Sequence, residues 1–174
     1  YNYYKQKLLP NTKIICMVKA FGYGAGSYEL TKTLQDVGCS YVAVAVADEG
    51  AELRKAGITM PIMVMNPEMG TFDTLFKYNL EPEVYSFRLL DALTKAASSQ
   101  GITDFPIHIK IDSGMHRLGF SIQDMPKLIK ELSLNKELSP CSVFSHLAGS
   151  DDENLDYYTE SQIDVFSRCA ESLQ

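Results

Sequence analysis

Six apolar runs of strand length alternate with segments of helical periodicity, and this alternation constrains the fold more than any other feature of the chain. The runs lie at 13–19, 41–47, 61–66, 82–86, 105–112 and 141–147. Several are apolar at consecutive positions, as in strands that are covered on both faces. Because strict alternation of strands and helices favours a parallel sheet, the sequence predicts an α/β fold.

Helices are expected between these strands. Three of them have a capping residue at the start and a glycine after the end. The expected caps are Ser27, Asp48 and Ser86, and the glycines are Gly38, Gly57 and Gly101. Two further helices are predicted from apolar residues at helical spacing. One contains Met125, Leu128, Ile129 and Leu132, and the other Ile163, Phe166, Ala170 and Leu173.

The length of the repeating unit indicates a barrel. Six units in 174 residues give 29 residues each, and eight such units need about 230 residues, near the size of a (β/α)8 TIM-type barrel. We therefore predict that residues 1–174 form one partial barrel domain, truncated to about six β/α units. An open doubly wound sheet fits the alternation as well. The opening stretch "YNYYKQKLLP" reads as the inside of a helix, so we expect a piece of a longer protein.

Charge and cysteine content exclude several classes of protein. The net charge of −6 argues against a nucleic-acid surface. No apolar run is long enough to span a membrane and no signal peptide opens the chain, so we expect a cytoplasmic protein without a membrane partner. The four cysteines are far apart and lack the spacing of a zinc site. We predict buried free thiols at Cys16, Cys39, Cys141 and Cys169.

The stretch "MVKAFGYGAG", residues 17–26, places Lys19 at the carboxyl end of the first strand. Folds of this class carry their chemistry at that end. A lysine in a partly dry mouth has a lowered pKa and is a better nucleophile toward an aldehyde. Tyr23 offers a phenol to an anion, and the helix that begins near Ser27 adds a positive dipole end.

Three glycines follow Lys19 at alternate positions, at 22, 24 and 26. Glycine permits left-handed backbone and close approach of a ligand. The pattern matches neither a dinucleotide-binding nor a Walker A loop. A glycine-rich turn with a solvated lysine is therefore the alternative interpretation.

A second group of polar residues lies in "IHIKIDSGMHRLGF", residues 107–120. His108, Lys110 and Asp112 alternate with isoleucines, so one face of the strand is polar. A buried lysine needs a partner or must lose its charge. Arg117 follows the turn, and its fork of donors suits an oxyanion or a carboxylate. The alternative is an ion pair of Asp112 with Arg117 at the strand end.

Two features follow the sixth run. His146 ends that strand in "VFSHLAGSDD" and is either a site residue or a structural histidine. The acidic stretch at 151–154 is expected to be a solvated loop that caps the next helix. No metal site is predicted.

Together these residues resemble the alanine racemase family of fold-type III enzymes, which use pyridoxal 5′-phosphate (PLP), over essentially the whole chain. "VKAFGYGAG" is similar to the family's V-K-A-x-x-Y-G-x-G, and "FSHLAGSDD" to its T-H-F-A-x-A-D. The most specific string is "KIDSGMHRLGF", similar to K-x-D-[ST]-G-M-x-R-L-G. Phe21, His116 and Gly149 depart from the family pattern.

The resemblance implies a role for each candidate site residue. Lys19 holds the cofactor covalently and is one of two acid/base groups. Tyr23 contacts the cofactor phosphate. Arg117 lies near the phenolic oxygen of the cofactor and the substrate carboxylate, and Lys110 orients Arg117 and is carbamylated in many members. His146 holds an arginine that contacts the pyridine nitrogen.

The resemblance also implies an activity, the interconversion of L- and D-alanine for peptidoglycan synthesis in the bacterial cytoplasm. The longer protein of which this chain is a piece is then a homodimer. A tyrosine from the C-terminal β domain of the other subunit is the second base, and the 174-residue chain alone is inactive. Two alternatives remain. One is another fold-type III protein: a racemase for a different amino acid, a decarboxylase or a PLP carrier. The other is a non-catalytic barrel that binds a phosphorylated ligand.

Overall fold

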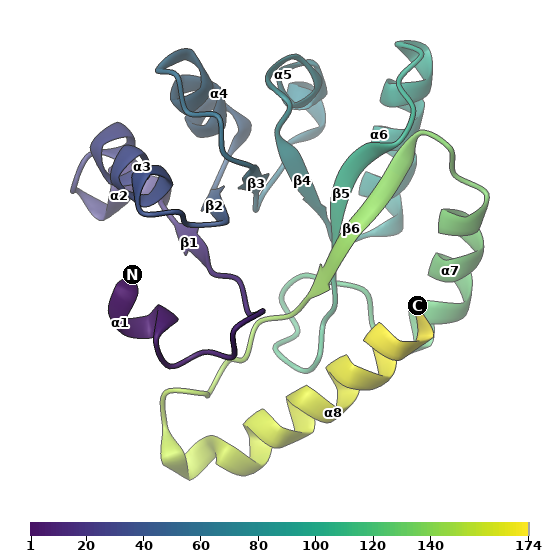
Figure 1. Ribbon diagram of the computed structural model, residues 1–174. Helices are drawn as coiled ribbons and strands as arrows, with labels where there is room; N and C mark the ends of the chain where they lie inside the picture. The colour runs from purple at the N-terminus through teal and green to yellow at the C-terminus, as the bar shows by residue number, and fades with distance from the viewer. Residues whose placement is uncertain (174) are drawn as a thin grey trace. The chain divides into compact units, whose positions relative to one another are not determined.

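The computed structural model describes residues 1–173 and contains six parallel strands. They are β1 (Ile15–Met17), β2 (Tyr41–Val44), β3 (Ile62–Val64), β4 (Glu81–Val84), β5 (Phe105–Lys110) and β6 (Leu138–Phe144). In the sheet they follow one another in chain order (Figure 1). A doubly wound sheet reverses its strand order at a switch point. The uninterrupted order β1 to β6 confirms the barrel-type alternative.

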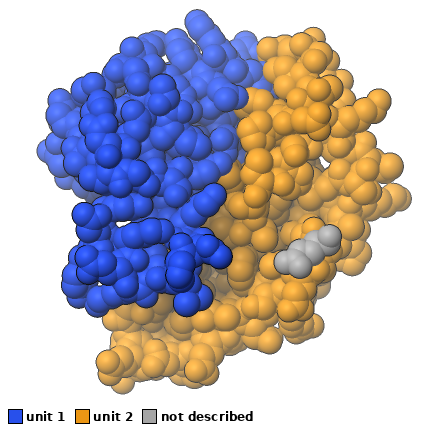
Figure 2. Space-filling model, in the orientation of Figure 1, with its two compact units in different colours: residues 1–82 blue, residues 83–174 orange. Residues whose placement is uncertain are grey.

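The described chain forms two compact units, shown in blue and orange in Figure 2. Unit 1 is Tyr1–Pro82 and unit 2 is Glu83–Gln174. The boundary lies inside β4: its first two residues pair with β3, and its last two pair with β5. The two candidate groups of site residues lie one in each unit.

The first helix of unit 1 precedes β1, and the others lie between β1 and β4. In chain order these helices are α1 (Asn2–Lys5), α2 (Lys19–Tyr23), α3 (Ser27–Asp36), α4 (Ala47–Lys55), the short 3-10 helix η1 (Met69–Thr71) and α5 (Phe72–Tyr78). The apolar core is formed by strand residues and by helix residues that face them. Its most buried members include Val42, Val44, Ile62, Val64, Leu75 and Leu80.

Two of the predicted helix caps in unit 1 are wrong. Ser27 is the first residue of α3, because Gly26, with φ of 89°, takes the capping position before it. Asp48 lies inside the first turn of α4, which the chain enters from the extended residue Val46. Neither helix has a side-chain cap, so the backbone that leads into each helix sets its start.

The helices of unit 2 are α6 (Phe87–Ser99), η2 (Ile122–Asp124), α7 (Met125–Ser133), η3 (Glu153–Leu155) and α8 (Asp156–Ser172). Ser86 caps α6 as predicted, since its Oγ accepts a hydrogen bond of 3.2 Å from the Leu89 N–H. The predicted last helix is present as α8, but its apolar stripe is only partly as predicted. Phe166, Ala170 and Leu173 are half-buried, whereas Ile163 is 46% exposed and Gln162 and Cys169 are fully buried. Gln162 can be buried because its amide finds hydrogen-bond partners inside the unit.

Strand β6 begins three residues earlier than the sequence predicts, at Leu138, and ends at Phe144. All four cysteines are free, as predicted. Cys39 and Cys169 are buried and Cys16 is half-buried, but Cys141 is exposed. The prediction fails at Cys141 because β6 is an edge strand of the sheet. Among the described residues, no helix combines the length and the apolarity that a membrane span requires.

Candidate active site

Lys19 follows β1 by two residues and is the first residue of α2. The chain just before it is anchored, because Val18 is 1% exposed and its N–H donates to the Ala43 carbonyl at 2.8 Å. Lys19 itself is exposed. The partly dry environment expected from the sequence is therefore wrong for this side chain, because the chain turns outward immediately after Val18.

This outward turn is left-handed. Five consecutive residues have positive φ: Ala20 (53°), Phe21 (55°), Gly22 (61°), Tyr23 (56°) and Gly24 (90°). Backbone hydrogen bonds of 3.1 Å close it, from the Gly22 N–H to the Val18 carbonyl and from the Gly26 N–H to the Phe21 carbonyl. The predicted left-handed glycines are confirmed, but the sequence did not indicate that three residues with side chains would join them.

Tyr23 and Phe21 are exposed on this turn, at 65% and 69%. Beside it, the Glu49 carboxylate accepts hydrogen bonds from the N–H groups of Ala20 and Ala45. Sequence reasoning missed Glu49. The available signal was an acidic residue in the first turn of a helix that follows a strand end.

In unit 2 the structure brings together three of the predicted site residues. Lys110, Arg117 and His146 line one small hollow, which Met115 and Ser145 also border. Lys110 is the last residue of β5, and His146 lies two residues beyond the end of β6 rather than in the strand. Arg117 and His146 are exposed, whereas Lys110 is only 6% exposed.

The Lys110 amine is buried against an aromatic ring and lies near several charged side chains. Its Nζ lies 4.3 Å from the centre of the Phe144 ring, which favours the cation. Burial lowers the pKa of Lys110, the negative charge of Glu83 opposes this, and the positive charge of Arg117 lowers the pKa further. The lysine whose pKa is lowered in this group of site residues is thus Lys110.

Glu83 is a buried acid that sequence reasoning missed. It lies on β4 opposite His108 in the ladder with β5, is 2% exposed, and its Oε2 has no hydrogen-bond partner. Burial raises the pKa of Glu83 to about 7, against the opposing charges of Lys110 and Arg117. The signal was a glutamate inside a short strand expected to be covered on both faces.

His146 lies within the field of the same two cations. Burial lowers the pKa of His146, and the positive charges of Arg117 and then Lys110 lower it further. A neutral imidazole next to Arg117 can accept a hydrogen bond from a guanidinium.

Asp112 closes the turn that presents Arg117. Its Oδ1 accepts hydrogen bonds from the N–H groups of Gly114 and His116, at 3.0 and 2.9 Å. Its Oδ2 lies 3.4 Å from the His116 Nδ1. In the part of the chain that the structure describes, no ion pair joins Asp112 to Arg117, so the structural alternative for this segment is wrong.

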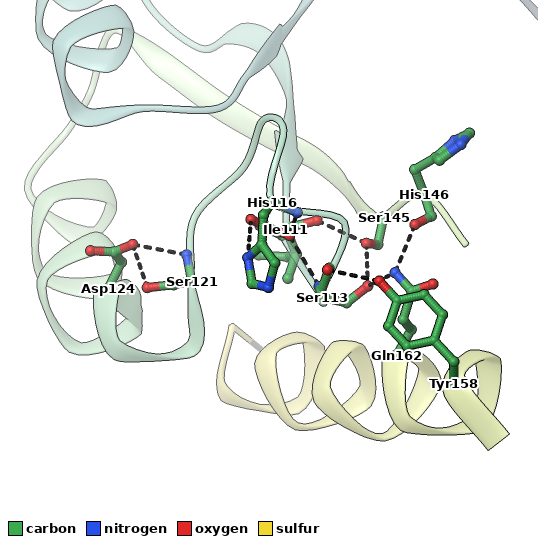
Figure 3. A network of polar contacts seen from close by, with 11 residues as sticks. Ile111, Ser113, His116, Ser121, Asp124, Ser145, His146, Tyr158 and Gln162 are labelled. Carbon is green, nitrogen blue, oxygen red and sulfur yellow. Dashed lines mark hydrogen bonds and ion pairs between the residues drawn. The ribbon is translucent and has the colours of Figure 1, made fainter. Parts of the chain in front are cut away.

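Helix α8 supports both loops of this site (Figure 3). The Nε2 of Gln162 donates to the Ser113 Oγ at 3.2 Å and to the His146 carbonyl at 3.0 Å. The Tyr158 hydroxyl donates to the Gly114 carbonyl at 2.7 Å. The loop that carries Arg117 and the loop that carries His146 are therefore fixed to one helix. Sequence reasoning missed Gln162.

The acidic stretch at 151–154 caps the next helical segment, as predicted. The Asp152 Oδ1 accepts a hydrogen bond of 2.9 Å from the Asn154 N–H at the start of η3. Residues 1–173 contain no group of three or more His, Cys, Asp or Glu side chains that could hold a metal ion.

Comparison with known proteins gives one consistent family. The family model "Alanine racemase, N-terminal domain" matches residues 1–174. The alanine racemase of Clostridium novyi (strain NT) is 38% identical over 175 residues, which cover 97% of this chain and 44% of that protein. An amino-acid racemase of Enterococcus faecalis is 37% identical over 151 residues, 86% of this chain and 20% of that protein.

Solved structures point to the same family. The alanine racemase of Clostridium difficile 630, in complex with cycloserine, superposes with a TM-score of 0.92 at 32% identity, over 99% of this chain and 47% of that one. The alanine racemase of Bacillus anthracis with bound L-Ala-P superposes with a TM-score of 0.88 at 26% identity, over 98% of this chain and 44% of that one. The chain spans less than half the length of these relatives. Sequence, strand order and superposition together show that it belongs to the alanine racemase N-terminal domain family.

Proposed function

We propose that this chain is the N-terminal part of a PLP-dependent racemase that interconverts L-alanine and D-alanine. One observation carries the proposal: a lysine follows the first strand of a barrel-type sheet, in a chain that the alanine racemase family matches from end to end. The relatives named alanine racemase support alanine as the substrate.

The donor groups of the chain fit this cofactor. Lys19 offers an exposed primary amine to an aldehyde, and the exposed Tyr23 hydroxyl can donate to a phosphate. Gly24 lies on the same turn, and a Cβ built on it meets no atom within 4 Å, so the surface there is open. PLP bound there would supply an electron sink for the charge that develops at the substrate α-carbon. The Lys19 Nζ would remove the α-proton from one face of the substrate or return it to that face.

The site residues of unit 2 supply positive charge and orient the groups that contact the cofactor and the substrate. Arg117 has no carboxylate partner among the described residues, so its guanidinium is available for a substrate carboxylate and for the phenolic oxygen of PLP. Lys110 is the supporting residue, held by burial against Phe144. Carbamylation converts a buried cation beside Arg117 into an anion that can pair with it, which remains our proposal for Lys110. His146 is proposed to hold a second arginine near the pyridine ring.

Racemisation needs two acid/base groups on opposite faces of the substrate, each worth about 10²–10⁴-fold. Lys19 supplies one. We propose that the second is a tyrosine from the C-terminal domain of the other subunit of a homodimer, which the greater length of the relatives accommodates. The product D-alanine then serves peptidoglycan synthesis in the bacterial cytoplasm.

A racemase assay tests this function. The protein, in the longest form that its gene encodes, is incubated with PLP and separately with L-alanine, D-alanine and L-serine. Alanine should racemise from both directions to the same equal mixture, at a rate that falls when PLP is removed.

Each other outcome of this assay points to a different protein. Racemisation of serine but not of alanine identifies a racemase for another amino acid. PLP binding without racemisation, by a chain whose gene encodes no further domain, identifies a carrier. Absence of PLP binding contradicts the proposal.

A further inference from the structure

We propose that Glu49 is a positioning residue that holds the left-handed turn after Lys19 and so fixes the base of the Lys19 side chain. This inference rests on the proposed function, because it assigns a supporting role to a residue beside the cofactor-binding lysine. It concerns unit 1 alone, in which all the contacts lie.

The turn needs external support. L-residues in left-handed helical conformation are disfavoured by about 1–2 kcal/mol each, and Ala20, Phe21 and Tyr23 all adopt it here. Such backbone persists only where the surrounding structure over-determines it, and it concentrates at functional sites. All three side chains are exposed and gain little from packing, so hydrogen bonds must supply the support.

Glu49 supplies a charge-assisted hydrogen bond at the first strained residue. Its Oε1 accepts from the Ala20 N–H at 2.8 Å. That N–H belongs to the peptide that joins Lys19 to Ala20, so the bond fixes the plane of this peptide. Hydrogen bonds from an N–H to a carboxylate are about twice as strong as neutral ones. The orientation in which Lys19 leaves the backbone is therefore tied to the position of Glu49.

The second carboxylate oxygen ties the turn to the sheet. The Glu49 Oε2 accepts from the Ala45 N–H at 2.7 Å, one residue beyond the end of β2. One side chain thus joins the chain after β1 to the chain after β2. Neither bond goes to an N–H of α4, so this is not a helix cap in the ordinary sense.

The variant that tests this role is Glu49→Gln, which keeps the length of the side chain but leaves one acceptor oxygen for two N–H groups. The matched control is Asp48→Asn, since Asp48 lies in the same helical turn, is exposed and loses the same charge. A second control, Ala51→Gly, weakens α4 at a buried position without touching the carboxylate.

Two measurements decide the outcome. The first is hydrogen exchange of the Ala20 and Ala45 amides, which we expect to be about tenfold faster in Glu49→Gln than in the wild type and unchanged in Asp48→Asn. The second is the fraction of Lys19 that borohydride fixes to PLP at a limiting cofactor concentration. We expect an apparent affinity about tenfold weaker in Glu49→Gln and less than about twofold weaker in either control.

The proposal is overturned if Glu49→Gln leaves both amides as protected as in the wild type. It is also overturned if Ala51→Gly weakens PLP attachment as much as Glu49→Gln, because the effect is then one of general stability. If the wild type does not bind PLP at all, the proposed function fails, while the exchange of the two amides still decides whether Glu49 holds the turn.

Discussion

The Lys19→Ala protein is expected to lose covalent attachment of PLP completely. A carbon–nitrogen bond to the cofactor aldehyde needs an unprotonated primary amine, and alanine offers none. The variant should fold, because Lys19 is exposed and only the backbone around it is held by hydrogen bonds. The measurement is borohydride reduction in the presence of PLP, followed by the intact mass and by mapping of the modified peptide.

The matched control is Lys13→Ala, which removes an exposed amine two residues before β1 in the same unit. The Lys13→Ala protein should carry the same PLP label at Lys19 as the wild type. Lys110 is the informative competitor, because burial lowers its pKa and leaves more of its amine unprotonated at neutral pH. Label found at Lys110 in both the wild type and Lys19→Ala would contradict the assignment of Lys19 and move the covalent chemistry to the end of β5.

The fold could be predicted because its signal is distributed along the chain. Each of the six strands lies within or beside its predicted run, and the parallel order follows from the helices between them. The ends of the strands are harder to predict, because local sequence does not determine where the pairing of two strands begins. Strand β6 starts at Leu138, where its pairing with Phe105 begins, although the apolar run in the sequence starts later.

The candidate site was predicted where it depends on strand ends and missed where it depends on contacts between elements. Lys110, Arg117 and His146 gather because the carboxyl ends of β5 and β6 are adjacent. The environment of Lys19 depends on the handedness of one turn, which a pattern of glycines suggests but does not determine. Glu49 and Glu83 act on residues of neighbouring strands, so their roles follow only from the register of the sheet.

The Glu83→Gln chain is expected to be about 3 kcal/mol more stable than the wild type at pH 8 and equally stable near pH 4.5. Burial raises the pKa of Glu83 from its ordinary value of 4.5 to about 7. In that interval the folded state holds a proton that the unfolded state has released, so the stability of the wild type falls as the pH rises from 4.5 to about 7. At about 1.4 kcal/mol per pKa unit, the difference reaches about 3 kcal/mol and then stays constant.

Urea unfolding of both proteins between pH 4.5 and 8 measures this difference directly. Glutamine resembles the protonated acid in shape and cannot ionise, so the variant lacks this part of the pH dependence. Glu160→Gln, at an exposed position of α8, is the control and should follow the wild type at every pH. If Glu83→Gln and the wild type were equally stable at pH 8, ionisation of Glu83 would not destabilise the folded state, and the prediction would be wrong.

A carboxylate that lowers stability at neutral pH is not explained by the fold. Glu83 lies in the field of Lys110 and Arg117, which are the cations that the proposed function uses, and both favour its ionised form. The loss of stability is therefore the expected cost of keeping a negative charge beside two positive ones in a buried place. If the charge serves the site, Glu83→Gln should gain stability and lose racemase activity together, whereas a merely structural acid would change the first without the second.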